Sequence, residues 1–183
     1  MLKLTALSPE DIWKQGDRCC ASRSWEEKFF GKSNDIVLNS DIISTMSKKK
    51  HKQMNPAQVI ISANHPNPPE QHEVEAAHIL AQHFKCTVAF LTPIDDYKRK
   101  TADIVMQGVL WEIKSPIGTS KSTIGNQFRV ASKQARNIVI DTRRTSLEYD
   151  SIEKAVLFEL KNRPSVKRVI LIDKNDKVLA FQK

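Results

Sequence analysis

Three charged residues in one short segment, Asp103, Glu112 and Lys114, have the types and spacing of a site that acts on phosphates. Apolar runs on both sides of Gln107-Gly108 predict a β-hairpin with a two-residue turn. In that hairpin Asp103 lies opposite Glu112, and alternation of side chains places Lys114 on the same face. Opposed carboxylates repel each other, so Lys114 either neutralises them or helps them act around a hard divalent cation. With such a cation, Lys114 would orient or deprotonate a water, or stabilise charge developing on a phosphate.

The opposite face of the same hairpin is apolar, which predicts that it packs into the core. Its side chains are Ile104, Met106, Val109, Trp111 and Ile113. One face of the hairpin would then be structural and the other chemical.

A basic segment follows the hairpin. Between Lys121 and Arg144 it carries six positive charges against a single acid, Asp141. A helix predicted over residues 122–135 would align Arg129, Lys133 and Arg136 on one face, which either tracks phosphates or is an ordinary solvated surface. The residues we expect to contact nucleic acid are Lys121, Asn126, Gln127, Lys133, Arg136 and Arg144.

The elements that would position these side chains form an α+β domain. Helices are expected over residues 70–84, 122–135 and 150–161, and strands over 86–91, 102–106, 109–114, 137–141, 166–172 and 178–181. The order αβββαβαββ predicts a mixed or antiparallel sheet with helices packed against it. A cluster of Asn, Pro and His between positions 64 and 69 suggests a boundary, with residues 66–183 as the main domain. Residues 1–65 would be an N-terminal extension or a small helical subdomain, with short helices over 8–14 and 24–30.

Length and composition restrict the function classes. The chain has 183 residues, enough for one domain with an extension, and 29 Lys and Arg against 21 Asp and Glu, a net charge of +8. Nucleic acid is therefore the first partner to consider. No stretch has the length and apolarity of a membrane span, and the first residues do not resemble a secretory signal, so we expect a cytoplasmic protein.

Two resemblances sharpen this prediction. The hairpin resembles the PD-(D/E)XK nucleases, with Glu112-Ile113-Lys114 as the lysine motif and Asp103 as the acid, although Ala102 stands where the family name has proline. From about residue 102 to 181 the chain also resembles the C-terminal tRNA-nuclease domains of CdiA toxins of contact-dependent growth inhibition. The segments that carry this likeness are Leu110-Trp-Glu-Ile-Lys-Ser-Pro, Lys121-Ser-Thr-Ile-Gly-Asn-Gln-Phe, Ala135-Arg-Asn-Ile-Val-Ile-Asp-Thr-Arg-Arg and Val166-Lys-Arg-Val-Ile-Leu-Ile-Asp-Lys. The resemblance implies an endoribonuclease that cuts tRNA in the cytosol of a producing or target cell, and a cognate immunity protein that blocks it.

Two nuclease architectures are used by such toxins, and both stay open. In a PD-(D/E)XK-like core, Asp103 and Glu112 bind a divalent metal, Mg²⁺ or Mn²⁺, and Lys114 assists. In a barnase-like ribonuclease fold, similar to the colicin and RelE group, no metal is needed. Activation of the ribose 2′-hydroxyl and stabilisation of the phosphorane would then fall to Lys114, Thr123, Arg129 and Arg143. The matched segment contains no histidine, which favours the carboxylate-and-lysine version.

Two alternatives to a tRNA nuclease also remain. One is a DNA endonuclease with the same carboxylate-lysine chemistry. The other is a basic nucleic-acid-binding module without enzymatic activity, in which the acids are structural.

Overall fold

A computed structural model of the chain describes Ile12 and residues 57–63, 65–92, 101–120 and 122–183. Apart from Ile12, the two short helices expected near the N-terminus lie outside these residues, as does Lys121. Within the described part, no helix has the length and apolar character needed to cross a membrane.

The described residues form a mixed sheet of seven strands with three helices. The strands are β1 (Gln58–Ile60), β2 (Thr87–Phe90), β3 (Ile104–Met106), β4 (Val109–Lys114), β5 (Asn137–Asp141), β6 (Arg168–Ile172) and β7 (Val178–Gln182), and the helices are α2 (Gln71–Phe84), α3 (Ser122–Ala131) and α4 (Tyr149–Asn162). Neighbours in the sheet follow chain order from β1 to β7. The pairs β1–β2, β4–β5 and β5–β6 are parallel, and the others are antiparallel.

The expected order αβββαβαββ is confirmed from α2 to β7, and the sheet is the mixed type. Strand β1 precedes that order and pairs with β2, although it comes before the boundary suggested at residues 65–66. The division of the chain into 1–65 and 66–183 stays a prediction.

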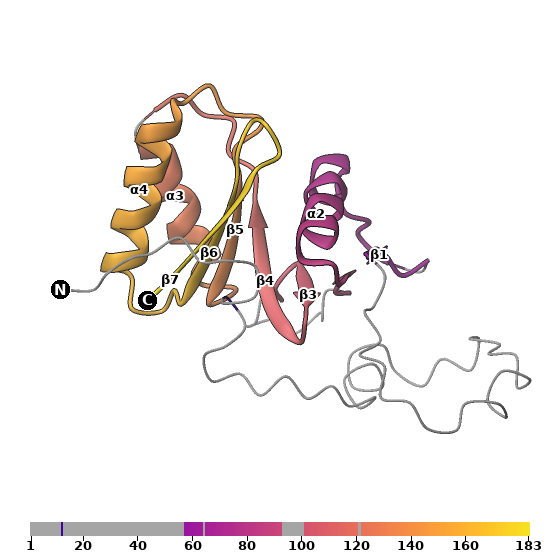
Figure 1. The fold of residues 1–183 in the computed structure, drawn as a ribbon. Coiled ribbons are helices and arrows are strands. Elements are labelled where there is room, and N and C mark those ends of the chain that lie inside the picture. Colours follow the sequence, from indigo (N-terminus) through magenta and orange to yellow (C-terminus); the bar gives the residue numbers. More distant parts are fainter. Residues whose placement is uncertain (1–11, 13–56, 64, 93–100, 121) are drawn as a thin grey trace, which may run out of the picture.

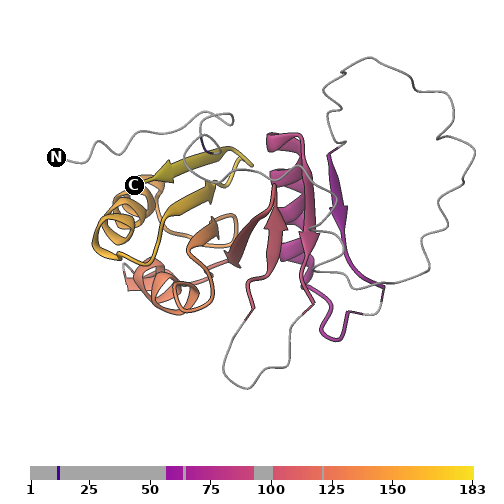
Figure 2. The same ribbon diagram turned by 90° about the horizontal axis from the view of Figure 1, so that it is seen from below.

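Helices cover the two faces of the sheet differently. Helix α2 lies on one face, and α3 and α4 lie together on the other (Figures 1 and 2). The α2 side buries Ala77 and Leu80 of the helix with Trp111, Ile113 and Val139 of the strands. On the other face, a separate cluster joins α3 and α4 to alternate residues of β5, β6 and β7. The central strands are therefore apolar on both faces, as is usual for strands that helices sandwich.

The predicted hairpin is confirmed with its register. Met106 pairs with Val109, and Ile104 with Trp111. The turn residues Gln107 and Gly108 have φ angles of 49° and 74°, the left-handed pair that a type I′ turn requires. The face of the hairpin predicted to be apolar is buried against α2, so the register leaves Glu112 and Lys114 on the opposite face.

Helix α3 is shorter than the sequence pattern predicts. It ends at Ala131, not at residue 135, because Lys133 N–H bonds Val130 O at 3.2 Å and Gln134 N–H bonds Ala131 O at 2.9 Å. These bonds between residues three apart tighten the end of the helix, so that the chain turns into β5. The predicted helical stripe is therefore wrong: Arg129 lies on α3, but Lys133 and Arg136 lie in the turn that follows.

Candidate functional site

Asp103 and Glu112 meet at one end of the β3–β4 hairpin. Asp103, one residue before β3, accepts a hydrogen bond from Ile113 N–H at its Oδ2, 2.7 Å away. The Glu112 side chain is completely buried. Its Oε1 accepts from Lys114 Nζ at 2.5 Å and from the side-chain amide of Gln134. Its Oε2 is buried and has no hydrogen-bond partner among the described residues. The structure thus brings together the three residues on which the sequence argument rests.

The two carboxyl groups disturb each other's ionisation. Burial, together with the charge of Asp103, raises the pKa of Glu112 to about 7, against the counteracting effect of Lys114. Burial also raises the pKa of Asp103, while the hydrogen bond from Ile113 and the charge of Lys114 lower it. Carboxyl groups held so close in a buried place tend to share one proton unless a cation compensates their charge.

The donor set at this pair fits a hard divalent cation. Glu112 Oε2 is a buried carboxylate oxygen without a donor, and the Asp103 carboxyl lies beside it. Among the described residues, no group of three or more His, Cys, Asp or Glu is placed to hold a metal ion. Mg²⁺ commonly binds through one or two carboxylates and completes its coordination with water and phosphate oxygens. The pair matches that mode and not a site built only from protein ligands.

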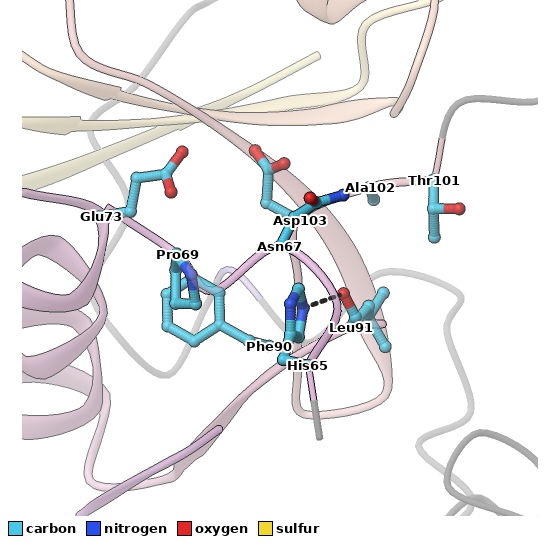
Figure 3. Close-up of a pocket in the computed structure, with 9 residues that line it drawn as sticks. All are labelled: His65, Asn67, Pro69, Glu73, Phe90, Leu91, Thr101, Ala102 and Asp103. Atoms are coloured by element: carbon cyan, nitrogen blue, oxygen red, sulfur yellow. Dashed lines mark hydrogen bonds between the residues drawn. The ribbon is translucent and has the colours of Figure 1, made fainter. Parts of the chain in front are cut away.

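A third carboxylate, Glu73 of α2, lies on the same side of a cavity as Asp103 (Figure 3). Its negative charge raises the pKa of Asp103. Glu73 also accepts a hydrogen bond from Glu70 N–H at 2.9 Å, as part of a capping box at the start of α2. Sequence reasoning missed Glu73, because its nearness to Asp103 depends on how α2 packs on the sheet.

Gln134 was missed for a similar reason. The expected helix continued through it, whereas the tight turn after α3 places its amide against Glu112. Its donor and Lys114 both engage Oε1, which orients the carboxylate, while Oε2 has no donor among the described residues. No sequence signal distinguishes Gln134 from an ordinary polar residue.

The remaining predicted catalytic residues lie apart from this pair. In the described part of the chain, no hydrogen bond or ion pair joins Thr123, Arg129 or Arg143 to Asp103, Glu112 or Lys114. Arg143 donates from Nε and Nη2 to the buried Asp141, at 2.9 Å each, which raises the pKa of the guanidinium. Strand alternation puts Asp141 on the α2 face, with Val139, and Arg143 reaches Glu75 of α2 at 3.7 Å.

Thr123 helps to hold the loop between β4 and α3. A Cβ on Gly118 would lie 2.5 Å from Thr123 Oγ1, so the two residues are packed tightly. The same glycine's carbonyl accepts a hydrogen bond from Thr145 Oγ1 at 2.7 Å. Thr123 therefore packs against a loop that Thr145 also holds. A catalytic role for Thr123 stays a prediction.

The residues expected to contact nucleic acid are largely at the surface. Asn126, Lys133, Arg136 and Arg144 are exposed, as is Arg129, and Gln127 is half-buried. Arg129 lies on α3, and Lys133 and Arg136 lie between α3 and β5, in the same stretch that supplies Gln134 to Glu112. Exposed basic residues therefore lie in the segment that also contacts the carboxylate pair.

Comparisons with known proteins bear on the part of the chain that holds this site. Residues 100–178 match the family model described as the contact-dependent growth inhibition CdiA C-terminal domain. A solved structure, the CdiA-CT/CdiI toxin and immunity complex from Burkholderia pseudomallei, is similar to the chain with a TM-score of 0.46 and 19% identity, over 67% of this chain and 98% of that one. No curated protein matches the chain. The resemblance stated from the sequence is thus confirmed: over residues 100–178 the chain is similar to the C-terminal toxin domain of CdiA.

Proposed function

We propose that the chain is a toxin-type endonuclease that cleaves tRNA in the cytosol of a target cell. The observation that carries this proposal is the buried pair Asp103 and Glu112, with Lys114 bonded to Glu112, inside the segment similar to CdiA toxins. A buried pair of acids with raised pKa values is unfavourable for folding and is typical of functional sites. The choice of tRNA as substrate rests on the resemblance of the sequence motifs.

The proposed core is PD-(D/E)XK-like. Its support is the succession of α2, the β2–β3–β4 meander, α3 and β5, with Asp103 just before β3 and with Glu112 and Lys114 on β4. The engagement of Arg143 by Asp141 argues against the metal-free alternative, because that guanidinium is already neutralised on the other face of the sheet.

In this mechanism Asp103 and Glu112 would hold a divalent cation, Mg²⁺ or Mn²⁺. When bound, that ion supplies Lewis-acid stabilisation of charge on the phosphate oxygens. Gln134 and Lys114 keep Glu112 Oε1 occupied, so Oε2 is the oxygen of Glu112 that would be left for a cation, together with the Asp103 carboxyl. Lys114, one-fifth exposed, would orient the attacking water, whose oxygen bonds to phosphorus as the bond to the leaving oxygen breaks.

Two partners belong to the proposal. Exposed Arg129, Lys133 and Arg136 would grip the phosphate backbone of tRNA. A cognate immunity protein would protect the producing cell, as the resemblance to toxins of contact-dependent growth inhibition implies.

A gel assay tests the proposal and its rivals together. Purified protein is incubated with total tRNA and, separately, with plasmid DNA, in Mg²⁺ and in EDTA. We expect discrete tRNA fragments that disappear in EDTA and with Lys114→Met. Fragments that persist in EDTA but need Lys114 would favour the metal-free ribonuclease, and cleavage of the plasmid alone would favour a DNA endonuclease. Tight, salt-sensitive tRNA binding without any cleavage would overturn the proposed nuclease activity and favour a nucleic-acid-binding module.

A further inference from the structure

A cavity of about 190 Å³ opens beside Asp103, outside the contacts that hold Glu112 and Lys114. Pro69, Phe90, Leu91 and Ala102 form its apolar lining (Figure 3). At about 30 Å³ per water, the cavity has room for roughly six waters. Its volume is smaller than that of a typical pocket for a drug-sized ligand. Its size and walls therefore suit a single planar base and not a whole nucleotide.

The carboxylates that line the cavity are hydrogen-bond acceptors, and Asn67 and Thr101 add neutral polar groups that can donate or accept. The carboxylates of Asp103 and Glu73 lie at one end, and the imidazole of His65 lines the cavity below them (Figure 3). His65 Nε2 is 3.0 Å from Leu91 O, which can only accept, so the neutral ring carries its proton on Nε2. Nδ1 is then an acceptor, and it is buried without a partner among the described residues.

We infer that this cavity is a nucleobase subsite that prefers bases with an exocyclic amino group: adenine, cytosine or guanine. Nucleobases have apolar faces that suit the Pro69 and Phe90 walls, and amino N–H groups that suit an acceptor-rich end. Uracil fits less well, because its N–H lies between two carbonyls that would face Asp103 and Glu73. A phosphate is disfavoured by the same two carboxylates.

The cavity lies directly beside the proposed catalytic centre. Asp103 belongs both to the cavity lining and to the carboxylate pair, so a base bound there lies next to the scissile phosphate. This role rests on the proposed nuclease function. The subsite would select the nucleotide that flanks the cleaved bond. This selection would add specificity to the binding of the phosphate backbone by Arg129, Lys133 and Arg136.

Nucleoside binding tests the subsite without requiring cleavage. Adenosine, cytidine, guanosine and uridine are titrated into the full chain while the imidazole signals of His65 are followed by NMR. We expect the three amino-bearing nucleosides to shift these signals and to bind about 3–10-fold more tightly than uridine, the effect of roughly one hydrogen bond. Uridine binding as tightly as the others, or no response of His65 to any nucleoside, would overturn the subsite.

Variants separate the subsite from the chemistry. His65→Phe removes the acceptor but keeps a ring, and Asn67→Ala removes a neighbouring polar group of the lining; His78→Phe, at an exposed position of α2, is the matched control. We expect the first variant to abolish the preference among nucleosides and the control to retain it. If the wild-type chain cuts tRNA, His65→Phe should also relax the choice of base beside the cut. Unchanged preference in folded His65→Phe and Asn67→Ala proteins would contradict the inference, whereas nucleoside selection without tRNA cleavage would contradict only the proposed function.

Discussion

Glu112 is buried where a carboxylate is costly. Its side chain is completely buried, and its two favourable contacts, with Lys114 and Gln134, use the same oxygen. The other oxygen has no donor among the described residues, and the charge of Asp103 makes Glu112 more costly to ionise. A buried acid pair that opposes folding in this way is expected where the acids bind a cation.

The raised pKa of Glu112 predicts how stability depends on pH. In the cation-free protein the folded state holds this proton more tightly than the unfolded state between the ordinary value of 4.5 and about 7. The contribution of this proton to stability should therefore be fully present below pH 4.5 and be lost as pH rises through about 7. Glu112→Gln should raise the free energy of unfolding by roughly 2 kcal/mol at pH 8. Urea denaturation at pH 8 and pH 4.5 measures this; an equal difference at both values would contradict the burial of an ionisable pair.

Gln134 offers a second residue-scale prediction, as a group that positions Glu112. Gln134→Leu removes a donor to the ionised carboxylate, so the pKa of Glu112 should move above about 7. Because such supporting contacts set ligand geometry, Mn²⁺ affinity should fall about 10–100-fold. Carbon-detected NMR titration of Glu112 and calorimetry with Mn²⁺ measure these effects. Gln82→Leu, at an exposed position of α2, is the control. If both variants had the same Glu112 pKa and the same Mn²⁺ affinity, Gln134 would have no positioning role.

At the scale of elements, the β3–β4 hairpin fixes the geometry of the site. Its turn needs left-handed backbone at both central residues, and Gly108 at φ 74° adopts this without strain. A Cβ on Gly108 would meet nothing within 4 Å, so conformation alone decides the effect of a substitution there.

The hairpin turn therefore gives a sharp prediction. Gly108→Ala should lower the free energy of unfolding by about 1 kcal/mol, since alanine disfavours the left-handed region. Gly108→Asn should lower it by clearly less, because asparagine tolerates that region. Thermal and urea denaturation of both variants measure the difference. Equal losses for alanine and asparagine would show that the turn is not type I′.

The hairpin was predictable because its signals are local. Gln107-Gly108 sets the turn, the turn sets the register, and alternation then assigns Trp111 to the core and Glu112 to the site. The end of α3 was not predictable in the same way. Apolar and basic periodicity continues past Ala131, while the turn into β5 is imposed by the sheet.

The contacts made by helices to the site were also beyond the sequence. Glu73 approaches Asp103 only because α2 packs on the sheet, and Gln134 reaches Glu112 only because α3 ends early. Arg143 and Asp141 are close in sequence, so their pairing is local. The face of the sheet on which the pair lies, however, is set by the register of β5. Residues within one hairpin could thus be placed from the sequence, whereas residues on different elements could not.

For the whole molecule, charge distribution predicts how tRNA binds. The chain has a net charge of +8, and Arg129, Lys133 and Arg136 are exposed beside the segment that supplies Gln134. If they contact phosphates, changing Arg129 or Lys133 to Ala should weaken tRNA binding and reduce the salt dependence of affinity by about one charge each. Filter binding of a Glu112→Gln protein over a range of KCl concentrations measures both quantities.

Two exposed lysines far along the chain provide the control. Lys161 at the end of α4 and Lys174 in the β6–β7 turn carry the same charge without belonging to the proposed surface. Lys161→Ala and Lys174→Ala should leave the salt dependence unchanged. If all four substitutions had the same effect, binding would reflect net charge and not a defined surface.

If the carboxylate pair is the catalytic centre, Glu112→Gln should stop tRNA cleavage without preventing tRNA binding. The measurement is single-turnover cleavage in Mg²⁺, with tRNA affinity and folding checked on the same protein. We expect a rate lower by roughly a thousandfold or more, with affinity for tRNA within about threefold of the wild type. A folded Glu112→Gln protein that cleaves tRNA at the wild-type rate would contradict this expectation.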